Sequence, residues 1–368
     1  MLSGHATPEG TGRFASRFPT LPAGHFRDVQ GLRASSLGLG TYLGEPDDAT
    51  DDATVRAVRA VLAAGANVLD AAINYRNMRS ERAIGRALTQ LVSDGEIRRD
   101  EVIVSTKGGF LPFDGDRPAD SQRYIADAYF ATGLVEPEEI VSGCHCMTPR
   151  FLQDQIDRSR KNLGLETIDV YYLHNPETQL ERVRSEVFYA RVRRAFGALE
   201  QAVASGKIRT YGVATWSCLR VPEGSRDHVS LERLSKIAED VAAPAAHHFG
   251  FVQLPFNIAM PEALTLSCQS VASESGPALL AARALGLSTM ASVPLLQAKL
   301  TRGLPPLVHE VFATCRTDAQ RAIQFVRSAP ALDVAVVGMK RPEHLEENLS
   351  LCGVAPAAHE DFMKLFRG

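Results

Sequence analysis

The chain has 368 residues, of which 45% are hydrophobic, and this length suffices for two average domains or for one large α/β barrel. Its 40 Lys and Arg residues are balanced by 43 Asp and Glu residues, which excludes a strongly basic surface for nucleic acid or for an anionic membrane. No apolar run approaches the about 20 residues that span a bilayer, and the N-terminus lacks the apolar stretch of a secretory signal. Six scattered cysteines without a C-x-x-C pair predict reduced thiols, so we expect a cytoplasmic protein with a small-molecule partner.

The first part of the chain, residues 1–30, is interpreted as an N-terminal extension and lead-in. Its stretch to about Pro22 is rich in Gly, Thr, Ser and Pro and predicts little order. Further along, short apolar runs of strand length alternate with amphipathic helical stretches, as is typical of βα units around a parallel sheet. Eight such runs lie at residues 35–39, 68–70, 102–106, 168–173, 210–214, 251–254, 288–293 and 333–337. We expect residues 31–368 to form one catalytic domain.

The helix signals are clearest between the third and fourth strands, where Thr148 is a candidate N-cap, Pro149 takes the first helical position and Gly164 ends the helix. Eight βα units without a linker predict a single (β/α)8 TIM barrel. The alternative is an open doubly wound sheet. Its usual dinucleotide fingerprint is not met, because Gly38, Gly40 and Gly44 are spaced one residue off and lack a convincing acidic partner about 20 residues further on.

One connection is unusually long. Residues 108–147 separate the third strand from the next helix, whereas βα loops usually take about 2–6 residues. The segment contains five aromatic residues, which argues against a disordered tail. We interpret it as a lid or substrate-pocket insert at the carboxyl ends of the strands, with a surface decoration or an oligomer contact as the alternative.

Three strands end in an ionisable residue: Asp70, Lys107 and His174. In a parallel barrel these strand ends share one face, so a carboxylate, an ammonium and an imidazole are expected to converge there, together with Tyr75. A nearby ammonium stabilises a phenolate, and we therefore expect Lys107 to lower the pKa of Tyr75. Asp70 would keep Lys107 charged and oriented, and His174 would donate a hydrogen bond to a carbonyl oxygen.

These residues resemble a known family. The segment NVLDAAINYRNMRSERAIGRAL, with Asp70 and Tyr75, is similar to the aldo-keto reductase segment that carries the catalytic aspartate and tyrosine. VIVSTKGGF supplies the matching Lys107, and IDVYYLHNPE supplies the matching His174. The resemblance implies a (β/α)8 barrel, an NAD(P)(H) molecule across its mouth, and hydride transfer to an aldehyde or ketone with Tyr75 as the proton donor.

The resemblance also implies a set of cofactor-binding positions, from the ends of six barrel strands and the helix that follows the last one. They are Gly40, Thr41, Tyr42, Asp70, Thr215, Gln253, Pro294, Leu295, Gly338, Met339, Lys340, His344, Glu347 and Asn348. The amides at the start of that last helix can bind an anion, and Lys340 and Arg341 add positive charge. We therefore expect NADP(H) rather than NAD(H).

The chain departs from the family at several of these contacts. Ala214 and Thr215 stand where serine and asparagine are usual, Ser292 replaces a stacking aromatic ring, and His344 replaces an arginine. These departures motivate two alternatives, a redox-neutral dehydratase, isomerase or cyclase on the same barrel, and a cofactor-binding regulatory subunit.

A metal site is not expected. Cys144, His145 and Cys146 suggest zinc at first sight, but a second pair of ligands at usable spacing is missing from the sequence, and we interpret the three residues as loop packing.

Overall fold

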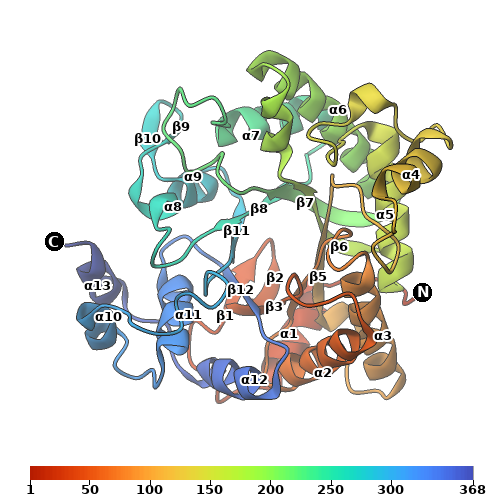
Figure 1. Cartoon of the computed structure of the whole chain (residues 1–368). Helices are drawn as coiled ribbons and strands as arrows, with labels where there is room; N and C mark the ends of the chain where they lie inside the picture. Colours follow the sequence, from red (N-terminus) through yellow and green to blue (C-terminus); the bar gives the residue numbers. More distant parts are fainter. Residues whose placement is uncertain (368) are drawn as a thin grey trace.

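The computed structural model describes residues 1–367, and within them eight parallel strands close into a barrel (Figure 1). The predicted (β/α)8 TIM barrel is therefore confirmed, and each of the eight expected strands lies within two residues of its predicted bounds at either end. In barrel order from the first in sequence, the strands are β3 (Leu37–Gly40), β4 (Val68–Asp70), β5 (Ile103–Gly108), β6 (Ile168–His174), β7 (Ile208–Ala214), β8 (Phe249–Pro255), β11 (Ser288–Ser292) and β12 (Val334–Gly338). Pairing of β12 with β3 closes the ring.

One helix outside the ring follows each barrel strand. These helices are α2 (Asp48–Ala63), α3 (Arg79–Ser93), α5 (Pro149–Leu163), α6 (Ser185–Ala204), α7 (Leu231–Ala242), α9 (Ala278–Ala284), α11 (Asp318–Ser328) and α12 (Pro342–Leu349). The predicted signals of α5 are confirmed, with Thr148 at its N-cap and Gly164 in a left-handed conformation at its C-cap. The described helices include none that is both long and apolar enough to cross a membrane. A cytoplasmic location stays a prediction.

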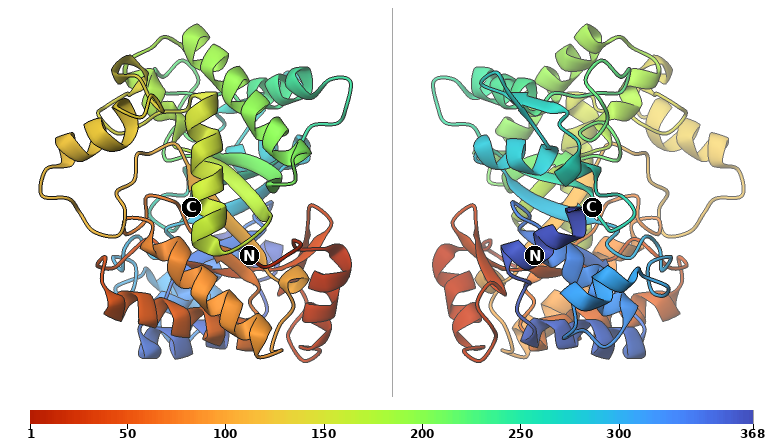
Figure 2. Two further views of the ribbon diagram at one scale, coloured as in Figure 1. Left: turned by 90° about the vertical axis from the view of Figure 1, so that its right-hand side faces the viewer. Right: turned by 90° about the vertical axis from the view of Figure 1, so that its left-hand side faces the viewer.

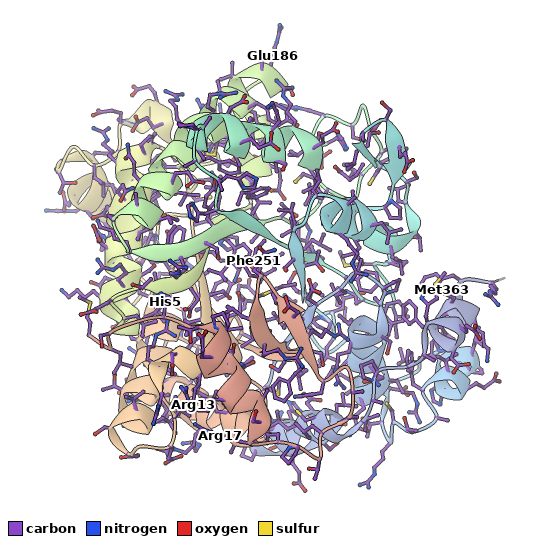
Figure 3. All side chains as sticks on the ribbon, turned by 180° about the vertical axis from the view of Figure 1, so that it is seen from behind. His5, Arg13, Arg17, Glu186, Phe251 and Met363 are labelled. Carbon is purple, nitrogen blue, oxygen red and sulfur yellow. The ribbon has the colours of Figure 1, made fainter. Side chains whose placement is uncertain are left out.

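The N-terminal segment differs from expectation. Instead of a stretch of little order, it forms α1 (Pro8–Ser16) and a hairpin of β1 (Phe26–Val29) and β2 (Leu32–Ser35). Thr7 caps α1, and Phe14 is buried, so a short helix with few apolar residues is held by packing rather than by its composition. Figure 2 shows these elements at the end of the barrel opposite the insert, and Figure 3 views that end directly, with Arg13 and Arg17 on α1. The two arginines pair with Glu101, which is fully buried.

The inside of the barrel is filled by side chains of the strands. They form one apolar cluster with Val29 and Ala34 of the hairpin, which therefore closes the amino-terminal end. Members of this cluster on the barrel strands include Val68, Ile103 and Phe251. With this end sealed, the carboxyl ends of the strands are left for a binding site.

The expected insert, residues 108–147, lies between β5 and α5. It contains α4 (Ser121–Ile125), one π-helical turn over Ala126–Phe130 and a 3-10 turn over Pro137–Glu139. It has a small core of its own around Tyr129 and Val135, which packs on Phe151 of α5. The remaining elements are α8 (Glu262–Thr265), β9 (Gln269–Val271), β10 (Glu274–Gly276), α10 (Pro306–Val311) and α13 (His359–Met363), and 3-10 turns lie at Arg99–Glu101, Pro176–Glu181, Ser350–Gly353 and Lys364–Phe366.

Candidate active site

A cavity of about 810 Å³ opens at the carboxyl ends of the barrel strands. Its lining includes Tyr75, His174 and Asp70, and all fourteen positions that the sequence suggested for a cofactor. Lys107 lies beneath the lining, where only 1% of its surface is exposed. The structure thus brings the four candidate catalytic residues and the candidate cofactor positions to one place.

The floor of this cavity is a buried ion pair. Lys107 Nζ donates to Asp70 Oδ2 at 2.6 Å and to the carbonyl oxygen of Ala71 at 2.7 Å. The second carboxylate oxygen of Asp70 accepts from Ser105 at 2.7 Å and from the Gln253 amide at 2.9 Å. Burial lowers the pKa of Lys107, and the charge of Asp70 opposes that shift. Because both carboxylate oxygens are engaged, Asp70 holds the ammonium in a fixed place.

Tyr75 lies above this pair, and its environment corrects one expectation. Its pKa is raised well above the usual value, first by burial and then by Asp70 and Tyr42, so the expected lowering by Lys107 is wrong. The reason is geometric: Lys107 Nζ lies 5.0 Å from the centre of the Tyr75 ring and is committed to Asp70 and a carbonyl. A phenol in this setting keeps its proton at neutral pH, so the protonated form that a proton donor requires is the one present.

His174 faces Tyr75 across the cavity, with the ring centres 5.9 Å apart. Burial, followed by the charge of Lys107, lowers its pKa well below the usual value, so the imidazole is neutral at physiological pH. Phe110, at the start of the insert, packs edge-on against His174 with ring centres 5.0 Å apart. A neutral imidazole offers one N–H, which is what a hydrogen bond to a carbonyl oxygen requires.

Two candidate cofactor contacts of the cavity are unsatisfied, one after β7 and one in α12. Thr215 Oγ1 and Asn348 Oδ1 are buried and lack a hydrogen-bond partner within residues 1–367. The charges at the start of α12 are already engaged: Lys340 Nζ donates to the Leu43 carbonyl at 2.9 Å, and Arg341 pairs with Glu343. The positive charge that the sequence placed here is therefore partly shared with protein groups.

Sequence reasoning missed part of the lining. Asn74 and Asn175 also line the cavity. The signal near them is in the backbone, since non-glycine residues with positive φ follow three site positions: Arg76 after Tyr75, Asn175 after His174 and Val293 after Ser292. Such backbone conformations are costly and cluster at functional sites.

The described residues, 1–367, include no group of three or more His, Cys, Asp or Glu side chains that is placed to hold a metal ion. His145 is instead fully buried and hydrogen-bonded to the His174 carbonyl oxygen. Cys146 packs in the small core of the insert. The interpretation of this trio as loop packing agrees with the contacts of these two residues.

The site thus combines a buried Lys–Asp pair, a tyrosine and a histidine at the mouth of a (β/α)8 barrel, an arrangement suited to proton transfer at a carbonyl. The family model described as Aldo/keto reductase family matches residues 36–228. The chain belongs to the aldo-keto reductase family. The match includes the four candidate catalytic residues and ends before Gln253 and the segment of α12.

Similar proteins agree with this assignment. Aldo-keto reductase family 4 member C11 of Arabidopsis thaliana is 24% identical over 204 residues, covering 54% of this chain and 51% of that protein. Aldo-keto reductase family 1 member C2 of Homo sapiens is 25% identical over 153 residues, covering 42% of this chain and 33% of that protein. The chain thus spans about half, or less, of these curated relatives.

Solved structures match over nearly the whole chain. An aldo-keto reductase from Klebsiella pneumoniae in complex with NADPH has a TM-score of 0.61 at 20% identity, covering 93% of this chain and 94% of that chain. The glycerol dehydrogenase AKR11B4 from Gluconobacter oxydans has a TM-score of 0.63 at 18% identity, with the same coverage of both chains. At these identities, the likeness shows the shared fold.

Proposed function

We propose that this protein is an NAD(P)(H)-dependent oxidoreductase that reduces an aldehyde or a ketone to an alcohol, or catalyses the reverse reaction. The observation that carries the proposal is the Tyr75–Lys107–Asp70–His174 set at the floor of the 810 Å³ cavity. Family membership supports it. The substrate itself stays open, because the pocket beside Tyr75 is lined by residues that the family pattern does not fix.

The residues of the cavity fit a nicotinamide dinucleotide. Asn348 Oδ1 and Thr215 Oγ1 are buried polar atoms without a partner in the described chain, and both residues line the cavity, where a ligand can satisfy them. The first amides of α12 lie at the Asn348 end of the cavity, next to Lys340. When bound, the dinucleotide supplies or accepts the hydride.

The chain's own residues would handle the proton and the carbonyl. In the reduction, Tyr75 donates its phenolic proton to the carbonyl oxygen, and the neutral His174 imidazole donates a hydrogen bond to the same oxygen. The positive charge of Lys107 lies beneath the phenol and favours the phenolate that remains after proton transfer, but burial outweighs this effect in the pKa of Tyr75. Asp70 keeps Lys107 in place, and Gln253 in turn donates to Asp70.

We further propose NADP(H) as the preferred cofactor. The proposal rests on Lys340 and Arg341, which line the cavity beside the start of α12. Since Lys340 now donates to the Leu43 carbonyl and Arg341 pairs with Glu343, a 2′-phosphate has to draw both side chains away from these partners. The ratio of kcat/KM for NADPH and NADH measures the preference, and equal values would contradict it.

The Tyr75→Phe variant tests the main proposal. Loss of the hydroxyl removes the proton donor but leaves the ring in place, so turnover of carbonyl substrates should fall by about 1,000-fold or more while the cofactor Kd changes by less than about 2-fold. Activity is followed by NADPH absorbance, and binding by titration of protein fluorescence. Tyr211→Phe is the matched control: it removes a hydroxyl that donates to Glu200, far from the mouth, and should keep the wild-type kcat. Retained turnover in Tyr75→Phe would overturn the assignment.

A redox-neutral reaction is the second candidate, and Ala214, Thr215 and Ser292 favour it because they replace the usual nicotinamide contacts. A cofactor-binding regulatory subunit is the third. Titration with NADPH and NADH separates them. An absence of binding up to high micromolar cofactor would favour the redox-neutral candidate, and binding without turnover on a panel of carbonyl substrates would favour the regulatory one.

A further inference from the structure

The base of the insert is closed directly beside His174. The Cys146 amide donates to the Gly109 carbonyl, and the Leu111 amide donates to the Cys144 carbonyl, both at 2.8 Å. Between these two bonds His145 points inward and is fully buried. A side chain at Gly109 would lie 2.9 Å from His145 Nε2 and 3.1 Å from the His174 carbonyl oxygen, so glycine is needed for this close approach.

A chain of hydrogen bonds fixes which nitrogen of His145 carries the proton. Arg191 of α6 has only donors, and it donates to Gln179 Oε1, which orients the Gln179 amide. Gln179 Nε2 therefore faces His145 Nδ1, at 2.8 Å, and that nitrogen must accept. Burial lowers the pKa of His145 to about 4, so the ring is neutral, and its single proton resides on Nε2. Nε2 donates to the His174 carbonyl oxygen at 2.8 Å.

The peptide that follows His174 is thereby held on both sides. Its carbonyl oxygen accepts from His145, and its N–H, on Asn175, donates to the Ala214 carbonyl at 2.6 Å. Asn175 has a φ of 43°, in the left-handed region that asparagine tolerates better than most other non-glycine residues. Phe110 packs against both His145 and His174, with ring centres 5.0 Å apart in each case.

We propose that His145 is a positioning residue of the active site: Arg191 and Gln179 orient His145 of the insert, His145 fixes the peptide of His174, and Phe110 packs against the His174 ring. The insert thus serves the reaction even where it does not touch the substrate. This inference rests on the proposed role of His174 in the reaction. The inference assigns the effect on kcat to the N–H donor at His145 Nε2 rather than to the bulk of the ring.

Two substitutions of His145 separate these properties. His145→Leu keeps the size and removes the donor, so kcat should fall by about 10- to 100-fold because a displaced His174 orients the carbonyl poorly. His145→Gln places an amide donor near the same point and should recover kcat to within about 3-fold of wild type. The cofactor Kd should stay within about 2-fold in both variants, since His145 does not line the cofactor cavity. A wild-type kcat in His145→Leu, or an equal loss in His145→Gln, would overturn the proposal.

The chain offers a matched control in His25. Like His145, it is fully buried and is hydrogen-bonded through Nε2 to a backbone carbonyl, that of Gly65, at 2.9 Å. It lies at the closed end of the barrel, beside the hairpin. His25→Leu should therefore lower stability as His145→Leu does but leave kcat unchanged. An equal loss of kcat in both variants would show a general effect of destabilisation and would contradict the proposal.

A readout besides activity separates this inference from the proposed function. Nitrogen-15 NMR of the histidine rings in the wild-type protein should show His145 protonated at Nε2 and not at Nδ1. Gln179→Glu should move the Nδ1 signal of His145, because a carboxylate at this position requires a proton on Nδ1. The other charged or titratable groups near the His145 ring are His174, Glu181 and Arg191. A wild-type proton on Nδ1 overturns the positioning chain. An inactive protein with the proton on Nε2 would instead contradict only the proposed function.

Discussion

At the scale of single residues, the site separates charge from proton donation. Asp70 and Lys107 are paired at the floor of the cavity, whereas Tyr75 and His174 line it higher up and are both neutral at physiological pH. Burial dominates all three shifted groups: it lowers the pKa of Lys107 and of His174 and raises that of Tyr75. Desolvation therefore decides the protonation states, and the neighbouring charges modify them.

The raised pKa of Tyr75 predicts the pH dependence of the reaction in each direction. Reduction needs the protonated phenol, so its kcat should be constant between about pH 6 and pH 9. Oxidation needs the phenolate, so its kcat should rise with pH over the same range. Steady-state rates in both directions, at saturating cofactor, provide the measurement. A reduction rate that already declines between these pH values would mean that Lys107 outweighs burial.

At the scale of elements, α1 makes one close backbone contact with the rest of the chain in addition to its cap, its buried Phe14 and its ion pairs. Gly10 of α1 packs on the chain at Asp100, and a Cβ at Gly10 would overlap the Asp100 carbonyl oxygen, which is backbone and unable to move away alone. Gly12, in the same helix, has nothing within 4 Å of the same position. A methyl group therefore has no room at Gly10 but has room at Gly12, although both glycines lie in α1.

This pair gives a matched stability test. Gly10→Ala should destabilise the protein by about 1–3 kcal/mol, because the extra methyl group forces α1 away from the barrel. Gly12→Ala should stabilise it by about 0.5–1 kcal/mol, because alanine is the better helix former. Unfolding in urea measures both. If Gly10→Ala is as stable as Gly12→Ala, α1 does not dock as the structure describes.

The elements also differ in how well the sequence predicts them. Most barrel strands are predictable because they are short, mainly apolar runs, and several of them are ended by a polar residue, as at Asp70 and His174. The hairpin of β1 and β2 was not predicted. Its two-residue turn has positive φ at Gln30 and Gly31, but the sequence has glutamine at the first of these positions, where Asn, Asp or Gly usually signals such a turn. In the candidate site, the strand-end residues were predictable because strand polarity places them together.

The contacts of His145 could not have been predicted in the same way. It lies 29 residues before His174 in the sequence, and 34 residues separate it from Gln179. Such pairs are set by how the insert folds back on the barrel, which depends on packing at many residues rather than on any local pattern.

At the scale of the whole molecule, one end of the barrel is closed and apolar, and the other end carries the candidate active site. The hairpin seals one end with apolar side chains, and the other end carries the cavity and the ionisable groups. Neutral histidines are buried at both ends, His25 beside the hairpin and His145 beneath the insert, and burial lowers the pKa of each to about 4. Their protonation therefore opposes folding of the entire chain.

This arrangement predicts that the protein loses stability in acid. An unfolded histidine titrates near pH 6.5, so between about pH 6.5 and pH 4 the unfolded chain binds protons at these sites and the folded chain does not; stability falls as the pH falls. For each of the two residues, the loss between pH 7.5 and pH 5 should amount to about 2 kcal/mol. In His25→Gln, the drop in unfolding free energy between these two pH values should be smaller than in wild type by that amount. His359→Gln, an exposed residue of α13, should leave the drop unchanged. Urea unfolding at pH 7.5 and pH 5 measures all three proteins, and a His25→Gln drop equal to the wild-type drop would mean that His25 is protonated in the folded state.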